Sequence, residues 1–350
     1  MPSCVFLPRF GAQAVALSCW LAAITNHAAD PPPTPFTDRA VAQVRRQADH
    51  LARGNRSVAA EFFSSLATAN FVQSRLSSLN YSVLSATKQK LPSSVEECLR
   101  LNAGICGNHV AAFLEIARRL DLRARPVEFY FRGAQPETNH SHICVEVFYG
   151  DRWRLFDITW GSYFRRPDGA LDDLADIAAL RADRRSRAWA ITNQSDLWYQ
   201  QWKASGLDPL EYLDDPRVDI LRGRRGTIHL EPAERKGGRV VYRPLHQPNF
   251  VGCNRADRDY GALTVDLVTP PADATVAHLE VLGLAGVGDL VLTVGAQRIA
   301  VPFTELVSGQ TRTIPFARPL GKQTVRLQAT PRAPGGVAYL VFRTITLETR

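Results

Sequence analysis

The chain has 350 residues, of which 45% are hydrophobic and 22% charged, and its formal net charge at pH 7 is +8. These proportions are ordinary for a globular protein, and the length favours two hydrophobic cores over one. The positive charge comes mainly from arginine and is spread along the chain, which argues against a nucleic-acid-binding protein.

Residues 1–29 have the features of an export signal. Arg9 precedes an apolar run over 10–24, and the small pair Ala28-Ala29 suits a cleavage site. The run is too short to span a bilayer comfortably. We therefore expect an exported protein, periplasmic or extracellular, with a retained anchor or a lipid attached to Cys19 as the lesser alternatives.

A proline-rich segment over residues 30–36 predicts a stiff linker. Beyond it, apolar residues recur at helical spacing in three stretches that should pack against a catalytic core. The three stretches are 37–52, 58–66 and 71–84. A shorter helix is predicted over 93–101.

The sequence Gly104-Ile105-Cys106-Gly107 opens an amphipathic helical pattern. Its apolar positions are Val110, Phe113, Leu114, Ala117 and Leu120. Cys106 therefore lies at a helix N-terminus, where unpaired backbone N–H groups and the positive end of the macrodipole favour a thiolate and can bind an oxyanion. Gly104 and Gly107 allow close approach of another backbone or a substrate. The alternative interpretation is a small, buried, apolar cysteine.

A β-hairpin is predicted downstream of this helix. After a strand over 127–131 and a polar loop, residues 142–149 alternate with period two. Gly150-Asp151 then reads as a two-residue turn, and residues 152–159 as the returning strand.

The register of this hairpin decides what its side chains can do. If Tyr149 pairs with Arg152, His142 and Asp157 share one face as diagonal neighbours, about 7–8 Å apart at the backbone. A one-residue slip would separate them. A nucleophilic thiol needs a base, and the imidazole needs an acceptor that fixes its tautomer. Cys106 joins this pair only if its helix start packs on the same face.

Four other residues are candidates for substrate contact. His109 lies on the helix of Cys106 and His140 precedes the strand, but neither has an aspartate placed across a ladder, so each is a substrate-rim or a structural residue. Trp160 and Tyr163 follow Asp157 and suit a substrate groove, with a place in the core as the alternative.

Three motifs carry a resemblance to a known family: Gly104-Ile105-Cys106 with its helix, His142-Ile143-Cys144-Val145-Glu146-Val147, and Trp153 followed by Asp157-Ile158-Thr159. In this order they resemble the transglutaminase-like superfamily, over roughly residues 90–165. The resemblance implies a papain-like α+β fold in which Cys106 is the nucleophile, His142 the base and Asp157 the orienting acid.

Two residues depart from the family's pattern. Cys144 stands where an aromatic residue is common, and Ile158 where a proline often follows the aspartate. Cys144 would share the face of the histidine and could pair with an oxidised Cys106. If a structural disulfide exists, the pairing of Cys98 with Cys253 spares the site. No Cys/His spacing matches a zinc site and no glycine-rich loop suits a nucleotide, so we expect neither metal nor cofactor.

The rest of the chain predicts a mixed region and then an all-β domain. Helices are predicted over 171–182 and 195–204, and the basic, glycine-rich stretch 217–243 suggests an exposed interdomain connection. Seven short segments rich in Val, Leu and Thr then follow, which indicates a β-sandwich or jelly roll. These segments are 263–268, 277–284, 290–294, 298–301, 311–316, 323–329 and 338–347. We place the catalytic domain at 37–235 and the sandwich at 236–350.

Taken together, the patterns predict an exported thiol enzyme that hydrolyses or transfers an acyl group at an amide or ester. Its substrate would be a peptide, a glycopeptide or a cell-envelope polymer. The alternative function is a catalytically silent transglutaminase-like module of the envelope, with a β-sandwich that binds carbohydrate.

Overall fold

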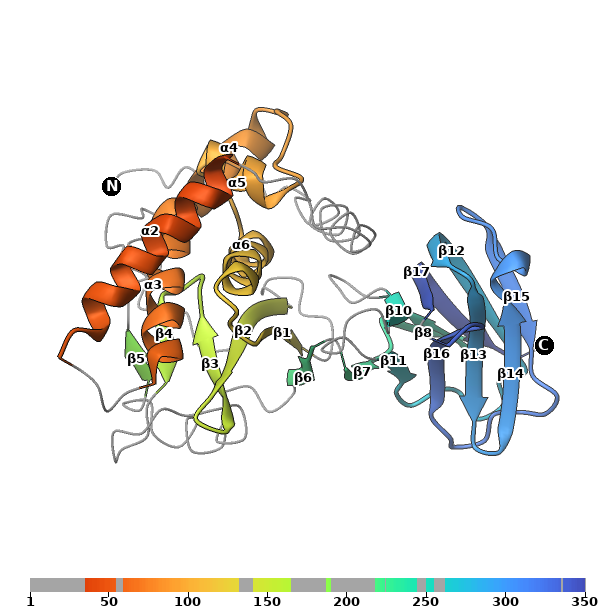
Figure 1. The fold of residues 1–350 in the computed structure, drawn as a ribbon. Helices are drawn as coiled ribbons and strands as arrows, with labels where there is room; N and C mark the ends of the chain where they lie inside the picture. Colours follow the sequence, from red (N-terminus) through yellow and green to blue (C-terminus); the bar gives the residue numbers. More distant parts are fainter. Residues whose placement is uncertain are drawn as a thin grey trace, which may run out of the picture. The chain divides into compact units, whose positions relative to one another are not determined.

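The computed structural model of the protein describes residues 35–54, 59–131, 141–164, 187–189, 218–223, 225–243, 250–254, 262–334 and 336–349. The chain divides into two compact units, residues 1–124 with 143–211 and residues 125–142 with 212–350 (Figure 1). The predicted export signal lies outside the described residues, as do His140 and the helices expected over 171–182 and 195–204.

The first unit contains the helices that the apolar spacing predicts. They are α2 (Pro35–Ala52), α3 (Ala60–Arg75), α4 (Ser78–Ala86), α5 (Val95–Leu101) and α6 (Cys106–Arg119). Helix α2 begins inside the predicted linker, with Pro35 as its first residue, a position where the missing N–H of proline costs nothing.

One predicted helix boundary is wrong. The expected gap over 67–70 is part of α3, and the break lies at Leu76 and Ser77 instead. Leu76 is extended and 1% exposed, and the Ser77 hydroxyl accepts the Asn80 N–H and so caps α4. A local cap and a buried leucine therefore decide the boundary.

The predicted hairpin is confirmed with its register. Strands β2 (Ser141–Tyr149) and β3 (Arg152–Asp157) pair from Tyr149 with Arg152 to Val145 with Phe156. Gly150 and Asp151 both have positive φ, as a type I′ turn requires. The order continues through β4 (Ser162–Phe164) to β5 (Arg187–Trp189), all antiparallel.

The core of this unit lies between the helices and one face of the hairpin. α3 and α6 lie beside β2 and β3 (Figure 1), and residues of α2 and α5 join the same core cluster. The buried hairpin residues that join the helices are Ile143, Val145, Val147, Tyr149, Phe156 and Ile158. Alternation along the strand leaves His142, Cys144 and Glu146 on the opposite face.

The second unit is built almost entirely from strands. Its strands are β1 (Ala124–Phe131), β6 (Val218–Arg222), β7 (Gly226–Leu230), β8 (Glu234–Lys236), β9 (Arg239–Tyr242), β10 (Phe250–Asn254), β11 (Ala262–Leu267), β12 (Val276–Gly286), β13 (Gly288–Val294), β14 (Gln297–Pro302), β15 (Thr311–Pro315), β16 (Val325–Pro331) and β17 (Val337–Glu348). The predicted strands at 127–131 and beyond residue 262 are all confirmed.

The predicted exposed connection over 217–243 is wrong for its described residues. β6 pairs with β1, β7 runs parallel to β11, and β9 pairs with β17. Leu221, Ile228 and Tyr242 are at most 2% exposed. Apolar residues between the arginines and glycines build these strands, so local composition is a poor guide to exposure here.

Strands β7 to β17 form a single 11-stranded hydrogen-bonded network, with the order β14-β13-β16-β11-β10-β17-β12-β15 along its main path. A jelly-roll sandwich stays a prediction. The α+β character of the protein is clear from the helix-rich first unit. In the described part of the chain, no helix has both the length and the apolar character needed to cross a membrane.

The packing of α6 on the hairpin yields a matched stability test. Val110 in α6 is fully buried and belongs to the core, whereas Val83 in α4 is 51% exposed. We expect Val110→Ala to lower the free energy of unfolding by about 1–3 kcal/mol through lost burial and a residual cavity. The control Val83→Ala should change it by less than about 0.5 kcal/mol. Urea denaturation measures both, and equal effects would contradict this core.

Candidate active site

Cys106 is the first residue of α6, as predicted. Its side chain is half-buried and packs against the helix-facing core cluster. Ile105, which precedes the helix, has an aliphatic side chain and provides no capping oxygen for the first-turn N–H groups. These donors are therefore suited to an anionic oxygen of a substrate.

The segment that precedes Cys106 is fixed by backbone hydrogen bonds to the start of α4. The Ser77 N–H donates to the Asn102 carbonyl (3.1 Å), and the Gly104 N–H donates to the Ser77 carbonyl (3.2 Å). The Ser78 hydroxyl also donates to the Gly104 carbonyl (3.2 Å). Asn102 itself has a left-handed backbone that ends α5. The cysteine therefore starts its helix from a rigid support.

Gly104 is required for space rather than for an unusual φ. A Cβ at this position would lie 2.8 Å from the Asn108 Cβ and 3.2 Å from the Leu76 Cδ1. Asn108 uses its side chain in two ways: Oδ1 accepts the Ile105 N–H (3.0 Å), and Nδ2 donates to the Cys98 sulfur (3.4 Å). The space at Gly104 is thus taken up by two side chains, whereas the sequence analysis expected another backbone or a substrate there.

Helix α5, which precedes this segment, is held by hydrogen bonds at both ends. The N–H and hydroxyl of Ser93, together with the Lys90 ammonium, hold the pKa of Glu97 at about 2. At the other end of α5, the Arg75 Nε donates to the Leu99 carbonyl (3.1 Å). Both ends of this short helix are therefore fixed by hydrogen bonds, and α5 gives the segment that leads to Cys106 a stable start.

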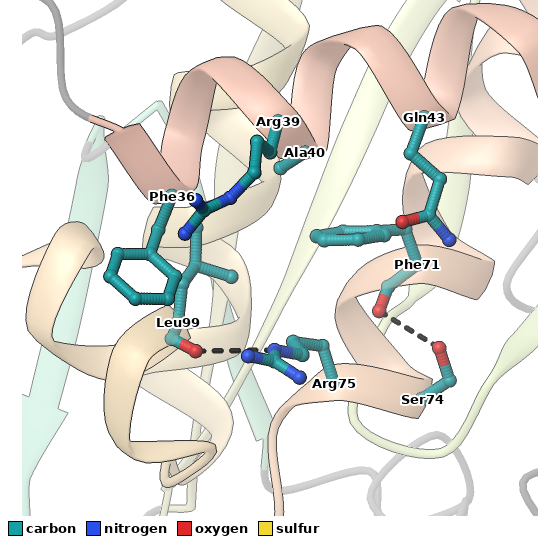
Figure 2. Close-up of a pocket in the computed structure, with 8 residues that line it drawn as sticks. All are labelled: Phe36, Arg39, Ala40, Gln43, Phe71, Ser74, Arg75 and Leu99. Carbon is teal, nitrogen blue, oxygen red and sulfur yellow. Dashed lines mark hydrogen bonds between the residues drawn. The ribbon is translucent and has the colours of Figure 1, made fainter.

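A hollow lies over α2, α3 and α5 (Figure 2). It is lined by Phe36, Arg39, Ala40, Gln43, Phe71, Ser74, Arg75 and Leu99. The Arg39 guanidinium lies over the Phe36 ring, 4.4 Å from its centroid. The lining contains no thiol, imidazole or carboxylate, so this hollow cannot supply the acid–base chemistry of acyl transfer.

The hairpin brings three potential reacting groups together on one face. Ligand atoms of His142, Cys144 and Asp157 all lie within 4.8 Å of one another. The ladder pairs Val145 with Phe156, and the same register continued by one residue sets Cys144 opposite Asp157 and His142 on the neighbouring diagonal. His142 is 7% exposed, and Cys144 and Asp157 are fully buried. The predicted closeness of His142 and Asp157 is confirmed.

Asp157 is oriented by the turn that follows it. Its Oδ1 accepts the N–H of Trp160 (3.1 Å), which holds the carboxylate at the end of β3. Ile158, in the position where the family often has proline, is fully buried in the core cluster. The turn is therefore anchored by an apolar side chain on one face and a carboxylate on the other.

The body of α6 packs on the hairpin face opposite to His142. The sequence analysis required only that the start of this helix lie on the face of His142, and that condition stays a prediction. Val110, Phe113 and Ala117 join the cluster that contains Ile143 and Val145. The physical reason is that the odd-numbered residues of β2 are apolar and give the helix its partner. Only the first residue of α6 and the start of β2 are candidates for bringing the thiol to the imidazole.

The other candidate residues are placed as follows. His109 is 2% exposed, and its ring nitrogens contact the carbonyls of Ile105 (2.9 Å) and Leu76 (3.2 Å), which favours a structural role. Trp160 is 9% exposed. The Tyr163 ring packs between those of Phe62 and Phe156 at centroid distances of 5.7 and 6.5 Å, as a core residue does.

Cys98, Cys106 and Cys144 form no disulfide. The condition for the pairing of Cys98 with Cys253 is therefore not met at Cys98. Cys98 is 2% exposed and accepts a hydrogen bond from Asn108 instead, so it belongs to the support of α6.

Residues 49–158 match the family model of the transglutaminase-like superfamily. This segment is similar to that superfamily. The match begins in α2 and ends just after β3, so it takes in Cys106, His142 and Asp157 and extends further towards the N-terminus than the motifs alone indicate. No curated protein matches the chain.

The crowding at Gly104 predicts a specific defect. In Gly104→Ala, the new methyl must displace Asn108 or Leu76, and we expect a loss of about 1–3 kcal/mol in unfolding free energy. Gly283 is the control, because a Cβ there meets nothing within 4 Å, and Gly283→Ala should change stability by less than about 0.5 kcal/mol. Urea titrations compare the two, and a neutral Gly104→Ala would show that the start of α6 can yield.

Proposed function

We propose that the protein is an exported cysteine-dependent enzyme that hydrolyses or transfers an acyl group, with Cys106 as nucleophile, His142 as base and Asp157 as orienting acid. The observation that carries the proposal is the buried approach of His142 to Asp157 within a transglutaminase-like segment. Cys106 is the third member of the proposed triad. It lies at the start of a helix whose first-turn N–H groups lack a side-chain cap.

The chemistry follows from these groups. His142 takes the proton of the Cys106 thiol, and the thiolate sulfur forms a bond to the carbonyl carbon of an amide or ester. The resulting oxyanion is stabilised by N–H groups of the first turn of α6. The imidazolium returns its proton to the leaving amine or alcohol, which gives an acyl-enzyme. Water or a second amine then releases the acyl group, and His142 accepts its proton.

The Cys144 sulfur lies within 4.8 Å of ligand atoms of His142 and Asp157, but it is poorly suited to be the nucleophile. Its side chain is fully buried in the middle of β2, so a substrate carbonyl cannot reach the sulfur. Cys106 is half-buried, at the tip of a helix. Accessibility therefore favours Cys106, and the proposal requires the helix tip and the first residues of β2 to meet.

Export, as the N-terminal sequence suggests, would bring the enzyme to peptides, glycopeptides or cell-envelope polymers. Substrate contact by Trp160 and Tyr163, a jelly-roll arrangement of the C-terminal strands and carbohydrate binding by them are further parts of this proposal. Trp160 is buried and Tyr163 is partly buried, so Tyr163 offers more surface for such a contact.

A reactivity assay tests the nucleophile. Alkylation by iodoacetamide at neutral pH, mapped by mass spectrometry, should modify Cys106 at least about 10-fold faster than an unstructured cysteine peptide, because the proposed base His142 would take the thiol proton as the sulfur reacts. His142→Ala and Asp157→Asn should both remove this advantage. Incubation with envelope extracts should leave an acyl adduct on Cys106 alone.

The matched control is Cys253→Ala, which removes a thiol in β10, outside the proposed triad and outside the support of α6, and should leave the alkylation rate of Cys106 within about threefold. If Cys106 is alkylated no faster than an unstructured cysteine peptide, and His142→Ala leaves that rate unchanged, the result would contradict the proposed enzymatic function. It would favour a catalytically silent binding module. Faster modification of Cys144 would reassign the nucleophile.

A further inference from the structure

Cys144 is the one member of the buried His142, Cys144 and Asp157 cluster for which the proposed reaction has no use. We propose that these three side chains bind a zinc ion, or a similar transition-metal ion, and that the bound ion switches the enzyme off. The coordination itself depends only on the cluster, whereas the inhibition rests on the proposed function of His142.

The ligand set is the first argument. An imidazole nitrogen, a thiolate sulfur and a carboxylate oxygen are the three kinds of ligand that Zn²⁺ takes in proteins, and three protein ligands with an open position are the usual pattern of a reactive zinc site. Mg²⁺ and Ca²⁺ prefer oxygen ligands alone, so the thiol selects against them. The earlier expectation of no metal site came from sequence spacing, which cannot detect ligands gathered across a hairpin.

The geometry is the second argument. Zn–N, Zn–O and Zn–S bonds of about 2.0–2.3 Å place ligand atoms about 3.3–3.8 Å apart in a tetrahedral site. The three ligand atoms here lie within 4.8 Å of one another, so small side-chain rotations suffice to bring them onto one ion. All three residues are buried on a strand pair of fixed register, which limits the entropy lost on binding.

The third argument concerns the consequence for the reaction. An ion on the ring nitrogen of His142 occupies the lone pair that would accept the thiol proton. It also draws the Asp157 carboxylate away from the imidazole. The free energy of metal binding would therefore oppose catalysis directly, without any movement of the fold. A chelator would restore the free base.

Cobalt is a suitable probe because Co²⁺ takes similar sites and shows a thiolate-to-metal charge-transfer band. We expect the reduced full-length chain to bind one Co²⁺ with such a band, and Zn²⁺ to displace it. Cys144→Ala should abolish the band and weaken binding by at least about 100-fold, since even a lost outer-shell partner costs roughly 10–100-fold. Cys144→Ser, which keeps the size of the side chain, tests the same point if the alanine variant folds poorly.

Cys98→Ala, Cys106→Ala and Cys253→Ala are the matched controls, and all three should keep the cobalt band. No band in the wild-type chain, or a band that survives both Cys144 variants, would overturn the site.

In the wild type, Zn²⁺ should also slow alkylation of Cys106 by at least about 10-fold, with recovery after chelation. Metal binding that leaves this rate unchanged would overturn the inhibition but keep the site. A wild-type Cys106 of ordinary reactivity that still shows the band would refute only the proposed function.

Discussion

The pairing register of β2 with β3 is the constraint on which the candidate site depends. A type I′ turn at Gly150 and Asp151 fixes which residues lie opposite each other, and every later pair in the ladder follows from it. Because side chains alternate with period two, a slip of one residue would move the whole polar set into the helical core. Such a slip would bury His142 and Asp157 among the aliphatic residues of α6. Burial of the apolar face against the helices therefore fixes the register, and with it the positions of His142 and Asp157 on the polar face.

Burial of ionisable residues on one face of the hairpin costs free energy. His142, Glu146 and Asp157 are nearly or fully buried, and an ionisable group removed from water is tolerated only with hydrogen-bonding or charged partners. The Trp160 N–H supplies one such partner to Asp157. These three buried ionisable residues do not serve stability alone, since apolar residues of similar size would pack as well. Their presence on one strand face is typical of a functional site.

The support of Cys106 shows a second constraint, which is rigidity at the start of a helix. Backbone bonds tie Ser77 to Asn102 and Gly104, and the Asn108 side chain reaches back to the Ile105 N–H and forward to the Cys98 sulfur. These contacts hold the first turn of α6 without covering its N–H groups by a capping side chain at Ile105. A cap there would improve the helix but would compete with an oxyanion for the same donors.

The sequence by itself determined the strand at 127–131, the hairpin, the strands beyond residue 262 and the helix that begins at Cys106, because each depends on local periodicity and turn chemistry. It also determined the closeness of His142 and Asp157, since a two-residue turn leaves only one favourable register. Tertiary structure decided the rest. The face of the hairpin that receives α6, the structural role of His109 and the buried strands within 217–243 all depend on partners far away in sequence, which no local pattern identifies. The gathering of a thiol with the imidazole and the carboxylate likewise became a potential metal site only when burial and distance were fixed in three dimensions.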